Sequence, residues 1–292
     1  MSDEPFLTHR SLLFTVAYEM LGSAADAEDV VQESWLRWAG VGDAARQEVR
    51  DPRAFLVRIV TRQALNRLRS VSRRREEYVG QWLPEPLLTS PDVAEDVEFA
   101  ESVSIAMLTV LETLGPDERA VFVLREVFDV PYDEIAEAVG KSATAVRQIA
   151  HRARGHVAAR RPRMAVSRTE QQQVVERFLA ALTTGDLQGL MDVLAPDVVL
   201  VADGGGLALA ARHPVEGSER VAAFLSRFSQ FAPGTEIATL LLNGAVAAWI
   251  DPAGELNTAV TFVFEGGRIS RIYAIRNPHK LRRLDQVAEL RR

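Results

Sequence analysis

Cysteine is absent from this sequence of 292 residues, which excludes disulfide bonds and thiolate metal sites. The five histidines lie scattered without the spacing of metal ligands (His9, His151, His156, His213 and His279). No apolar run approaches the roughly 20 residues that span a bilayer, and the N-terminal residues lack the basic-then-apolar order of a signal peptide. We therefore expect a cytoplasmic protein without a membrane partner, a metal or another cofactor.

Charge is distributed unevenly, although the formal net charge is only −6. Residues 53–75 contain eight arginines and no acid, and residues 141–163 contain seven basic residues and no acid. Between them, residues 79–118 contain nine acids and no lysine or arginine. This order predicts two nucleic-acid-binding modules joined by an acidic linker. The alternatives are a solvated basic face for each basic segment and a solvated spacer for the acidic one.

Residues 26–38, DAEDVVQESWLRW, predict one helix with two different faces. An apolar stripe at helical spacing should pack against neighbouring helices, and it consists of Ala27, Val30, Val31, Ser34, Trp35 and Trp38. On the opposite face, the aliphatic Leu36 lies among Asp29, Gln32 and Glu33. This face suits docking on a basic protein partner. An ordinary amphipathic helix with one exposed leucine is the alternative.

A long basic helix is predicted over residues 53–74, because Asp51 and Pro52 supply an N-cap and a proline at the first helical position. The face opposite its buried stripe carries a set of polar groups: Arg58, Arg62, Asn66 and Arg69. Arginines at helical spacing beside an amide suit contacts with phosphates and with unpaired bases.

Residues 115–157 predict a helix-turn-helix unit. A short helix over residues 131–139 ends at Gly140, and Ser142 caps a second helix that continues to about Val157. The outward face of the second helix carries Thr144, Arg147, Gln148, His151 and Arg154. Arginine and glutamine near the start of such a helix can read guanine and adenine edges in a major groove. A helical hairpin that does not bind DNA is the alternative.

Residues 168–292 show a mixed pattern. Helices over residues 170–183 and 187–194 precede a strand-like segment, 197–206, that ends in DGGG, and a third helix is predicted within residues 215–228. Asn243-Gly244 and Gly266-Gly267 predict two hairpins. We expect an α+β cone with a mostly antiparallel sheet, one face packed on helices and the other lining a cavity.

The order and spacing of three segments resemble the two domains of an extracytoplasmic-function (ECF) sigma factor over about residues 6–160: DAEDVVQESWLRW, the basic helix after DPRAFL, and LGPDERAVFVLREVFDVPYDEIAEAVGKSATAVRQIAHRAR. The resemblance implies that the β′ clamp helices of core RNA polymerase are bound by Asp29, Gln32, Glu33 and Leu36. It implies that the promoter minus-ten element is captured by Arg58, Arg62, Asn66 and Arg69. It also implies that the minus-thirty-five major groove is read by Thr144, Arg147, Gln148, His151 and Arg154.

The C-terminal region resembles the SnoaL-like domains of the nuclear-transport-factor-2 superfamily. Three motifs resemble those of the ECF subgroup with such an extension: WLPEP (Trp82, Leu83, Pro84, Glu85, Pro86), DGGG (Asp203, Gly204, Gly205, Gly206) and NPHKL (with Asn277, Pro278, Lys280, Leu281). The resemblance implies that the extension regulates sigma activity in cis, in place of a separate anti-sigma protein. From the residues themselves, the glycines permit close backbone approaches and the proline directs the following tail.

The predicted fold is therefore multidomain, with two all-α sigma domains, a σ2 helical bundle and a σ4 helix-turn-helix, followed by an α+β SnoaL-like cone. We expect the σ2 domain over residues 1–78, a linker over 79–97, the σ4 domain over 98–162 and the regulatory domain over 168–292. The expected function is promoter-specific transcription initiation as an alternative sigma factor, with core RNA polymerase and promoter DNA as partners.

Other functions stay open at this point. The cavity of the cone could sense a small-molecule ligand, because a shared fold does not transfer activity. SnoaL-like domains also include polyketide cyclases with a pocket aspartate as acid or base, which here would be Asp203 with His213 as its candidate partner. A lone carboxylate in a glycine loop is weak support, so we expect no enzyme. An ordinary one-component repressor is the competing class for the DNA-binding part.

Overall fold

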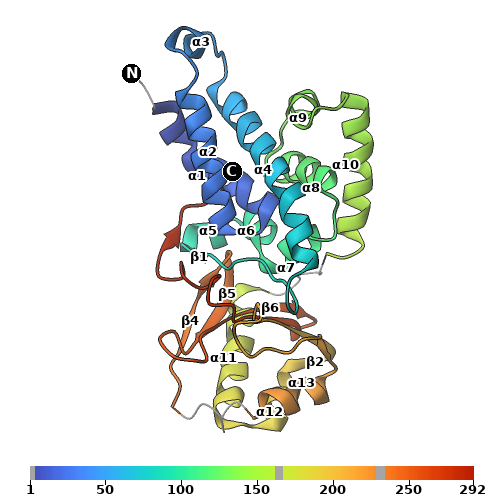
Figure 1. The fold of residues 1–292 in the computed structure, drawn as a ribbon. Helices are drawn as coiled ribbons and strands as arrows, with labels where there is room; N and C mark the ends of the chain where they lie inside the picture. Colours follow the sequence, from blue (N-terminus) through green and yellow to red (C-terminus); the bar gives the residue numbers. More distant parts are fainter. Residues whose placement is uncertain (1–3, 162–166, 228–233) are drawn as a thin grey trace.

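The structure, a computed structural model, describes residues 4–161, 167–227 and 234–292 (Figure 1). Two helical modules lie above a domain built on one sheet in this view. Some predicted features lie outside the described residues: the side chains of the arginines within residues 72–76, the end of the σ4 domain at residue 162 with Arg163, and Phe228. None of the described helices is long and apolar enough to cross a membrane.

The first helical module contains four helices: α1 Glu4–Leu21, α2 Ala24–Ala39, α3 Asp43–Gln47 and α4 Pro52–Glu76. Ser23 caps α2, because its side chain accepts a hydrogen bond from the amide of Asp26 at 3.2 Å. The apolar stripe of α2 is buried except at Trp35, which is 37% exposed. The prediction for Trp35 was wrong because this ring lies at the edge of the stripe, in a pocket that α1 only partly covers.

The second helical module begins inside the predicted linker and contains α5 Pro91–Glu95, α6 Val97–Val103, α7 Ile105–Leu111, α8 Pro116–Phe122, the π-helical turn η1 Val123–Val127, α9 Tyr132–Val139 and α10 Ala143–Ala158. Helix α9 ends at Gly140 in the left-handed conformation, and Ser142 caps α10 through the amide of Ala145. The predicted helix-turn-helix is therefore present. One apolar core runs from α1 and α4 into α8 and α10, so the two modules pack together.

The C-terminal domain combines three helices, α11 Arg168–Thr184, α12 Leu187–Val193 and α13 Ser218–Leu225, with a curved sheet (Figure 1). Its strands are β2 Leu194–Asp203, β3 Val215–Glu216, β4 Ile237–Leu242, β5 Ala245–Ile250, β6 Thr258–Glu265 and β7 Arg268–Ile275. Both predicted hairpins are present, β4–β5 turning at Asn243-Gly244 and β6–β7 at Gly266-Gly267. Strand β2 runs parallel to β7, and its other neighbour β3 is antiparallel.

The two faces of this sheet are covered differently from the prediction. The helices and the cavity share one face, where Phe178 of α11 packs on Phe262 of β6. The opposite face, with Tyr273 and Ile275 of β7, is buried under the WLPEP segment, α7 and the tail after β7. The expectation of helices on one face and a cavity on the other was therefore wrong. The reason is that the linker and α7, together with the tail, occupy the second face.

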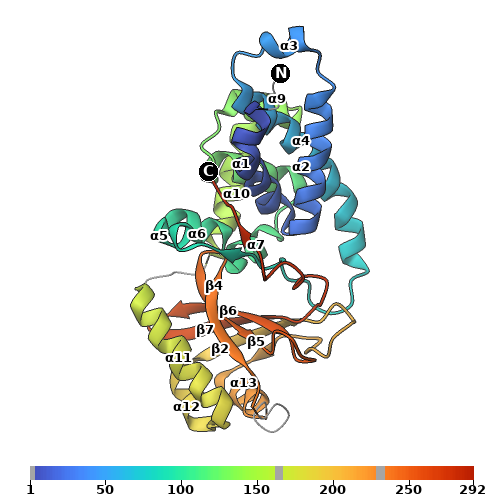
Figure 2. The ribbon, with the colours of Figure 1, turned by 90° about the vertical axis from the view of Figure 1, so that its left-hand side faces the viewer.

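Two short strands from distant parts of the chain extend the sheet. Strand β1 Leu88–Thr89, which follows WLPEP, pairs antiparallel with β4, and β8 Val287–Ala288 pairs parallel with β1. The tail then runs back to the first module (Figure 2). There Leu290 joins the apolar core, and the amide of Arg291 donates to the Thr15 hydroxyl at 3.0 Å. The C-terminal domain is thus joined to the helical modules through its sheet edge and through its tail.

Candidate functional site

The predicted polymerase-binding face of α2 is open to solvent. Leu36 is 58% exposed, and Gln32 and Glu33 are exposed beside it. Asp29 is exposed as well, but its carboxylate forms an ion pair with Arg67 of α4. All four predicted residues therefore lie on the surface, and Asp29 is paired with Arg67 of the same module.

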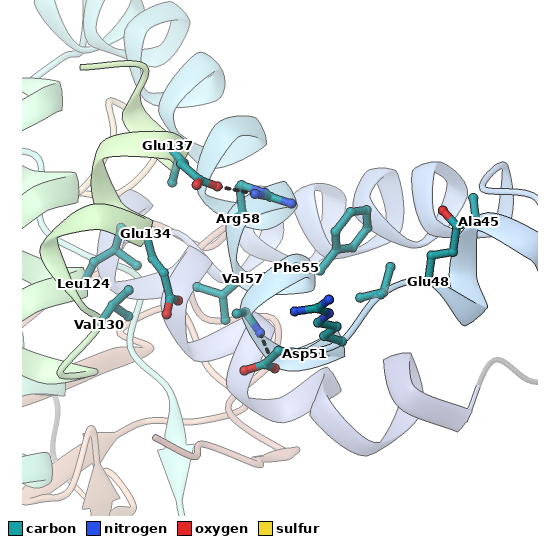
Figure 3. A pocket seen from close by; sticks show the side chains of 14 residues that line it. Ala45, Glu48, Asp51, Phe55, Val57, Arg58, Leu124, Val130, Glu134 and Glu137 are labelled. Atoms are coloured by element: carbon teal, nitrogen blue, oxygen red, sulfur yellow. Dashed lines mark hydrogen bonds and ion pairs between the residues drawn. The ribbon is translucent and has the colours of Figure 1, made fainter. Parts of the chain in front are cut away.

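The predicted minus-ten face of α4 is turned toward the second module (Figure 3). Arg58 forms an ion pair with the Glu137 carboxylate of α9, and Arg62 donates to the Glu137 carbonyl at 2.8 Å. Arg69 pairs with Asp117 of α8 at 2.9 Å. Asn66 lies exposed on the same helix. Three of the predicted DNA-binding side chains are thus engaged by the helix-turn-helix module.

Asp117 also forms an ion pair at 2.9 Å with Lys141, which lies in the turn before α10. Partial burial raises the pKa of Asp117, but hydrogen bonds from Lys141 and Arg69 outweigh this effect and hold the pKa below its ordinary value. Asp117 therefore stays ionised and links the basic groups of the two modules.

A cavity of about 360 Å³ separates the first turns of α4 from α9 (Figure 3). Val57 and Phe55 of α4 lie on one side, and Glu134 and Leu124 of the second module lie on the other. On this side of α4, the arginines contact the second module through the ion pairs of Arg58 and Arg69 and the hydrogen bond from Arg62 to the Glu137 carbonyl. Exposed pairs of this kind stabilise by about 0.2–1 kcal/mol each, so the ion pairs themselves hold the two modules together only weakly.

The predicted minus-thirty-five residues form one exposed face of α10. The side chains on it are Thr144, Arg147, Gln148, His151 and Arg154. The guanidinium of Arg147 lies 5.5 Å from the centre of the Tyr132 ring, and Arg154 pairs with Glu126 at 3.1 Å. Polar and basic groups spaced along one open helix face can enter a major groove.

The three motifs meet at the buried carboxylate of Asp203, at the end of β2. One oxygen accepts from the Tyr78 hydroxyl at 2.6 Å. The other accepts from the amide of Leu83 at 2.9 Å and from the ammonium of Lys280 at 2.6 Å. The Lys280 ammonium also lies 4.2 Å from the centre of the Trp82 ring. We call this set, Tyr78, Trp82, Leu83, Asp203, Asn277 and Lys280, the clamp.

The rest of the NPHKL motif completes the clamp. The Asn277 side chain donates to the Tyr78 hydroxyl at 2.7 Å, and the amides of Arg276 and Asn277 donate to the Asp203 carbonyl. Leu281 is buried beside Leu83, whereas Pro278 is exposed. Burial, and the hydrogen bond to Asp203, raise the pKa of the Tyr78 hydroxyl, so it stays a donor.

The DGGG loop reaches the clamp because it lacks side chains. Gly205 has φ +58°, and a Cβ there would lie 2.2 Å from the Asn277 amide nitrogen. A Cβ on Gly204 would meet the carbonyl of Ala208 at 2.2 Å, and Gly206 with φ +72° faces Val79. The predicted need for close backbone approach is therefore met at this loop.

Glu85 of WLPEP binds the start of α2. Its carboxylate accepts from the amide of Ala24 at 2.8 Å and from the Ser23 hydroxyl at 3.2 Å. Burial raises its pKa, while these hydrogen bonds lower it in part. A helix N-terminus attracts an anion, so Glu85 fixes the linker to the first module. Pro84 and Pro86 are buried on either side of Glu85.

Asn243 connects all three parts of the molecule, although its sequence context predicted only a hairpin turn. Its amide group donates to the Tyr18 hydroxyl of α1 at 2.7 Å and to the Val103 carbonyl of α6 at 2.8 Å. It also accepts from the amide of Leu87 at 2.9 Å. Tyr18 in turn donates to the Glu85 carbonyl. Sequence reasoning missed Tyr18, Tyr78 and Asn243, and no local pattern reports such distant partners.

The Asp203 carboxylate does not line the cavity of the C-terminal domain. It lies on the opposite face of the sheet, fully buried and bonded by the clamp. His213 is exposed and outside the cavity lining. These positions do not form the acid–base pair that the cyclase hypothesis requires.

Comparison with known proteins identifies three regions. The Sigma-70 region 2 family matches residues 6–74, the Sigma-70 region 4 family matches residues 104–157, and the SnoaL-like domain family matches residues 175–272. The ECF RNA polymerase sigma factor SigJ of Mycobacterium tuberculosis is 38% identical, over 96% of this chain and 93% of that protein. The probable ECF RNA polymerase sigma factor SigI of the same species is 34% identical, over 94% of this chain and 92% of its own length. The crystal structure of SigJ superposes with a TM-score of 0.74 at 34% identity, covering 96% of this chain and 98% of that chain.

Proposed function

The chain belongs to the ECF sigma factors that carry a C-terminal SnoaL-like domain, and from this premise we propose that the SnoaL-like domain regulates initiation in cis by holding a closed arrangement of the two sigma domains. The family's function is promoter-specific transcription initiation, with core RNA polymerase and promoter DNA as partners. The relatives are sigma factors and not enzymes, because RNA polymerase performs the chemistry.

The observation that carries the proposal is the clamp at Asp203. One carboxylate of the SnoaL-like domain binds Tyr78, two residues after α4, and Leu83 of the linker. The linker in turn binds α1 and α2 through Glu85. The clamp therefore fixes the chain that joins the sigma domains, at the point that determines how far apart they can move.

We assign the polymerase and promoter contacts of the sigma domains as the family resemblance implies. Leu36, with Gln32, Glu33 and Asp29 around it, binds the β′ clamp helices in the cytoplasm. Arg58, Arg62, Asn66 and Arg69 bind the minus-ten strand after Glu137 and Asp117 release them. The exposed face of α10 binds the minus-thirty-five groove. The functional boundaries are 1–78, 79–97, 98–162 and 168–292.

The proposal is tested by removing the acids that engage α4 while leaving its arginines in place. We expect Glu137→Gln with Asp117→Asn to raise the affinity of the free protein for a randomised single-stranded oligonucleotide by about threefold to tenfold, because exposed ion pairs hold roughly 0.2–1 kcal/mol each. The salt dependence of binding should become steeper, since more arginines reach phosphates. Fluorescence anisotropy at several salt concentrations measures both quantities.

The matched control is Glu134→Gln, on the same helix as Glu137 and lining the same cavity. It removes one negative charge without touching the ion pairs of Arg58 or Arg69. Equal affinity and equal salt slopes for the control and the double variant contradict the closed arrangement.

Promoter reading by α10 leads to a separate prediction. The promoter is first selected by the holoenzyme from a randomised duplex library. Arg147→Ala with Gln148→Ala should weaken binding to this promoter by about 1–3 kcal/mol per lost base contact. The minus-thirty-five preference should relax at the affected positions. Arg160→Ala, just beyond α10, serves as the comparison because a lost phosphate contact weakens all sequences equally. An unchanged selected sequence for the double variant contradicts the assignment.

Sensing of a small molecule by the SnoaL-like domain is the second candidate function. It is favoured by an apolar cavity of about 330 Å³ between the helices and the sheet. Cavities of roughly 300–1,000 Å³ are typical of small-molecule sites. A ligand there would act on the same domain that carries the clamp.

A further inference from the structure

The cavity of the SnoaL-like domain has an uneven chemical lining. Its walls are mainly aliphatic and aromatic, and Thr258 is the uncharged polar residue among its described lining residues. Two arginines, Arg227 and Arg276, also line it, and no acidic side chain does so within the described part of the chain. The protein as a whole has a net charge of −6, so a cavity whose charged lining residues are all basic differs from the rest of the chain. Such a lining favours a ligand with a large apolar part and a negative charge.

Arg276 is the cation whose bonding is incomplete. One terminal nitrogen donates to the Leu209 carbonyl, and the other lies 3.4 Å from the Glu255 carbonyl. Its Nε is buried and lacks a hydrogen-bond partner, and none of the described ion pairs includes this guanidinium. Burial lowers the pKa of Arg276, because it removes the charged guanidinium from water. A carboxylate bonded to Nε and one terminal nitrogen would satisfy it in a bidentate geometry.

We propose that this cavity binds a small apolar monocarboxylate, with the carboxylate on Arg276 and the apolar body among Phe178, Leu200 and Val260. This site gives the sensing function proposed above a ligand class. Only the effect of the ligand on regulation rests on that proposed function. A cationic ligand would be repelled by both arginines, and a neutral one would leave Arg276 unsatisfied. The apolar walls disfavour a polyphosphate, which needs several donors.

The rim of the cavity provides access for such a molecule. Leu209 is 87% exposed and Phe224 is 47% exposed, and both belong to the cavity lining. Leu209 lies three residues after the DGGG motif, and its carbonyl accepts from Arg276. A ligand carboxylate at Arg276 would therefore compete with a contact that holds the segment following DGGG.

Strand geometry connects this site to the clamp. Successive side chains of a strand point to opposite faces of the sheet. On β2, Ala202 lines the cavity and Asp203 binds the linker. After β7, Arg276 lines the cavity and Asn277 donates to Tyr78. Asp203 and Asn277 of the clamp thus each follow a cavity residue in sequence, so a backbone shift at Arg276 would also displace Asn277.

The test uses the full-length protein with decanoate and 2-naphthoate as probes, each paired with its uncharged methyl ester, in isothermal titration calorimetry. We expect saturable binding of at least one acid, at least tenfold tighter than its ester. Arg276→Gln should remove the difference between acid and ester, and Arg276→Lys should retain most of it. Arg271→Gln, at an exposed residue of β7 outside the cavity lining, is the control and should bind like the wild type. Circular dichroism establishes that each variant is folded.

Three results overturn the site: neither acid binds, acid and ester bind equally, or Arg276→Gln retains the preference for the acid. Amide hydrogen exchange at residues 78–83 separates the site from its regulatory consequence. Acid binding that also raises exchange in the wild type but not in Arg276→Gln supports both. Acid binding with unchanged exchange supports the site and contradicts ligand sensing through the clamp. If calorimetry overturns this site, the proposed closed arrangement of the sigma domains still stands. It is tested separately by Glu137→Gln with Asp117→Asn.

Discussion

Asp203→Asn is expected to destabilise the full-length protein by about 3–5 kcal/mol, because it leaves the ammonium of Lys280 buried without its counter-charge. The substitution keeps the size of the side chain, so no cavity is created. The measurable results are a lower urea midpoint and faster hydrogen exchange at the amide of Leu83, which donates to Asp203. The second effect reports release of the linker directly.

A double-mutant cycle isolates the pair from the surrounding packing. Lys280→Met should also destabilise, since it leaves the Asp203 carboxylate buried and uncompensated. Asp203→Asn combined with Lys280→Met should cost less than the sum of the single changes. Asp285→Asn, an exposed acid of the same tail, serves as the control and should stay within about 0.5 kcal/mol of the wild type. A loss below about 1 kcal/mol for Asp203→Asn contradicts the clamp as a main connection between the domains.

Leu36→Arg is expected to weaken binding to core RNA polymerase by about 100-fold or more, without a change in folding stability. The side chain is 58% exposed, so the arginine has room in the free protein. At an interface the same charge would be placed in the centre of an apolar contact surrounded by acids that match a basic partner. Fluorescence anisotropy with labelled sigma factor and core polymerase measures the affinity, and thermal unfolding measures the stability.

Leu187→Arg provides a matched control, because Leu187 is an exposed leucine of α12 in the SnoaL-like domain. This variant should bind core polymerase like the wild type. If Leu36→Arg binds within about threefold of the control, the exposed face of α2 is not the polymerase contact. Asp29→Asn should have a smaller effect than Leu36→Arg, since Asp29 is already paired with Arg67.

Local patterns in the sequence predicted the elements well where the signal is short-ranged. Ser142 caps the helix that follows it, and Asn243-Gly244 turns the predicted hairpin. These features depend on hydrogen bonds within a few residues, so the sequence contains the whole cause. The three short motifs were recognised by their resemblance to a family subgroup, and the structure brings them together.

Partners that are distant in sequence could not be predicted in this way. Periodicity shows that a face is apolar but not what covers it, so the sheet face under the linker was assigned to a cavity. The segment TAVTFVF of β6 did indicate that both faces of the sheet are covered, because apolar side chains occur at both its odd and its even positions. A strand with one solvent-exposed face would alternate apolar and polar residues. Asn243 gave no such signal, since its turn geometry and its bonds to Tyr18 and Val103 are independent properties.

The position of β8 and Leu290 has a consequence for synthesis of the protein. The ribosome completes both sigma domains well before residues 277–292, yet these residues supply Lys280 of the clamp and Leu290 of the core shared by the helical modules. A nascent chain therefore contains both sigma domains before the clamp can form. In the interval between translation of α10 and translation of the tail, the two sigma domains are joined only by the linker and by their direct contacts.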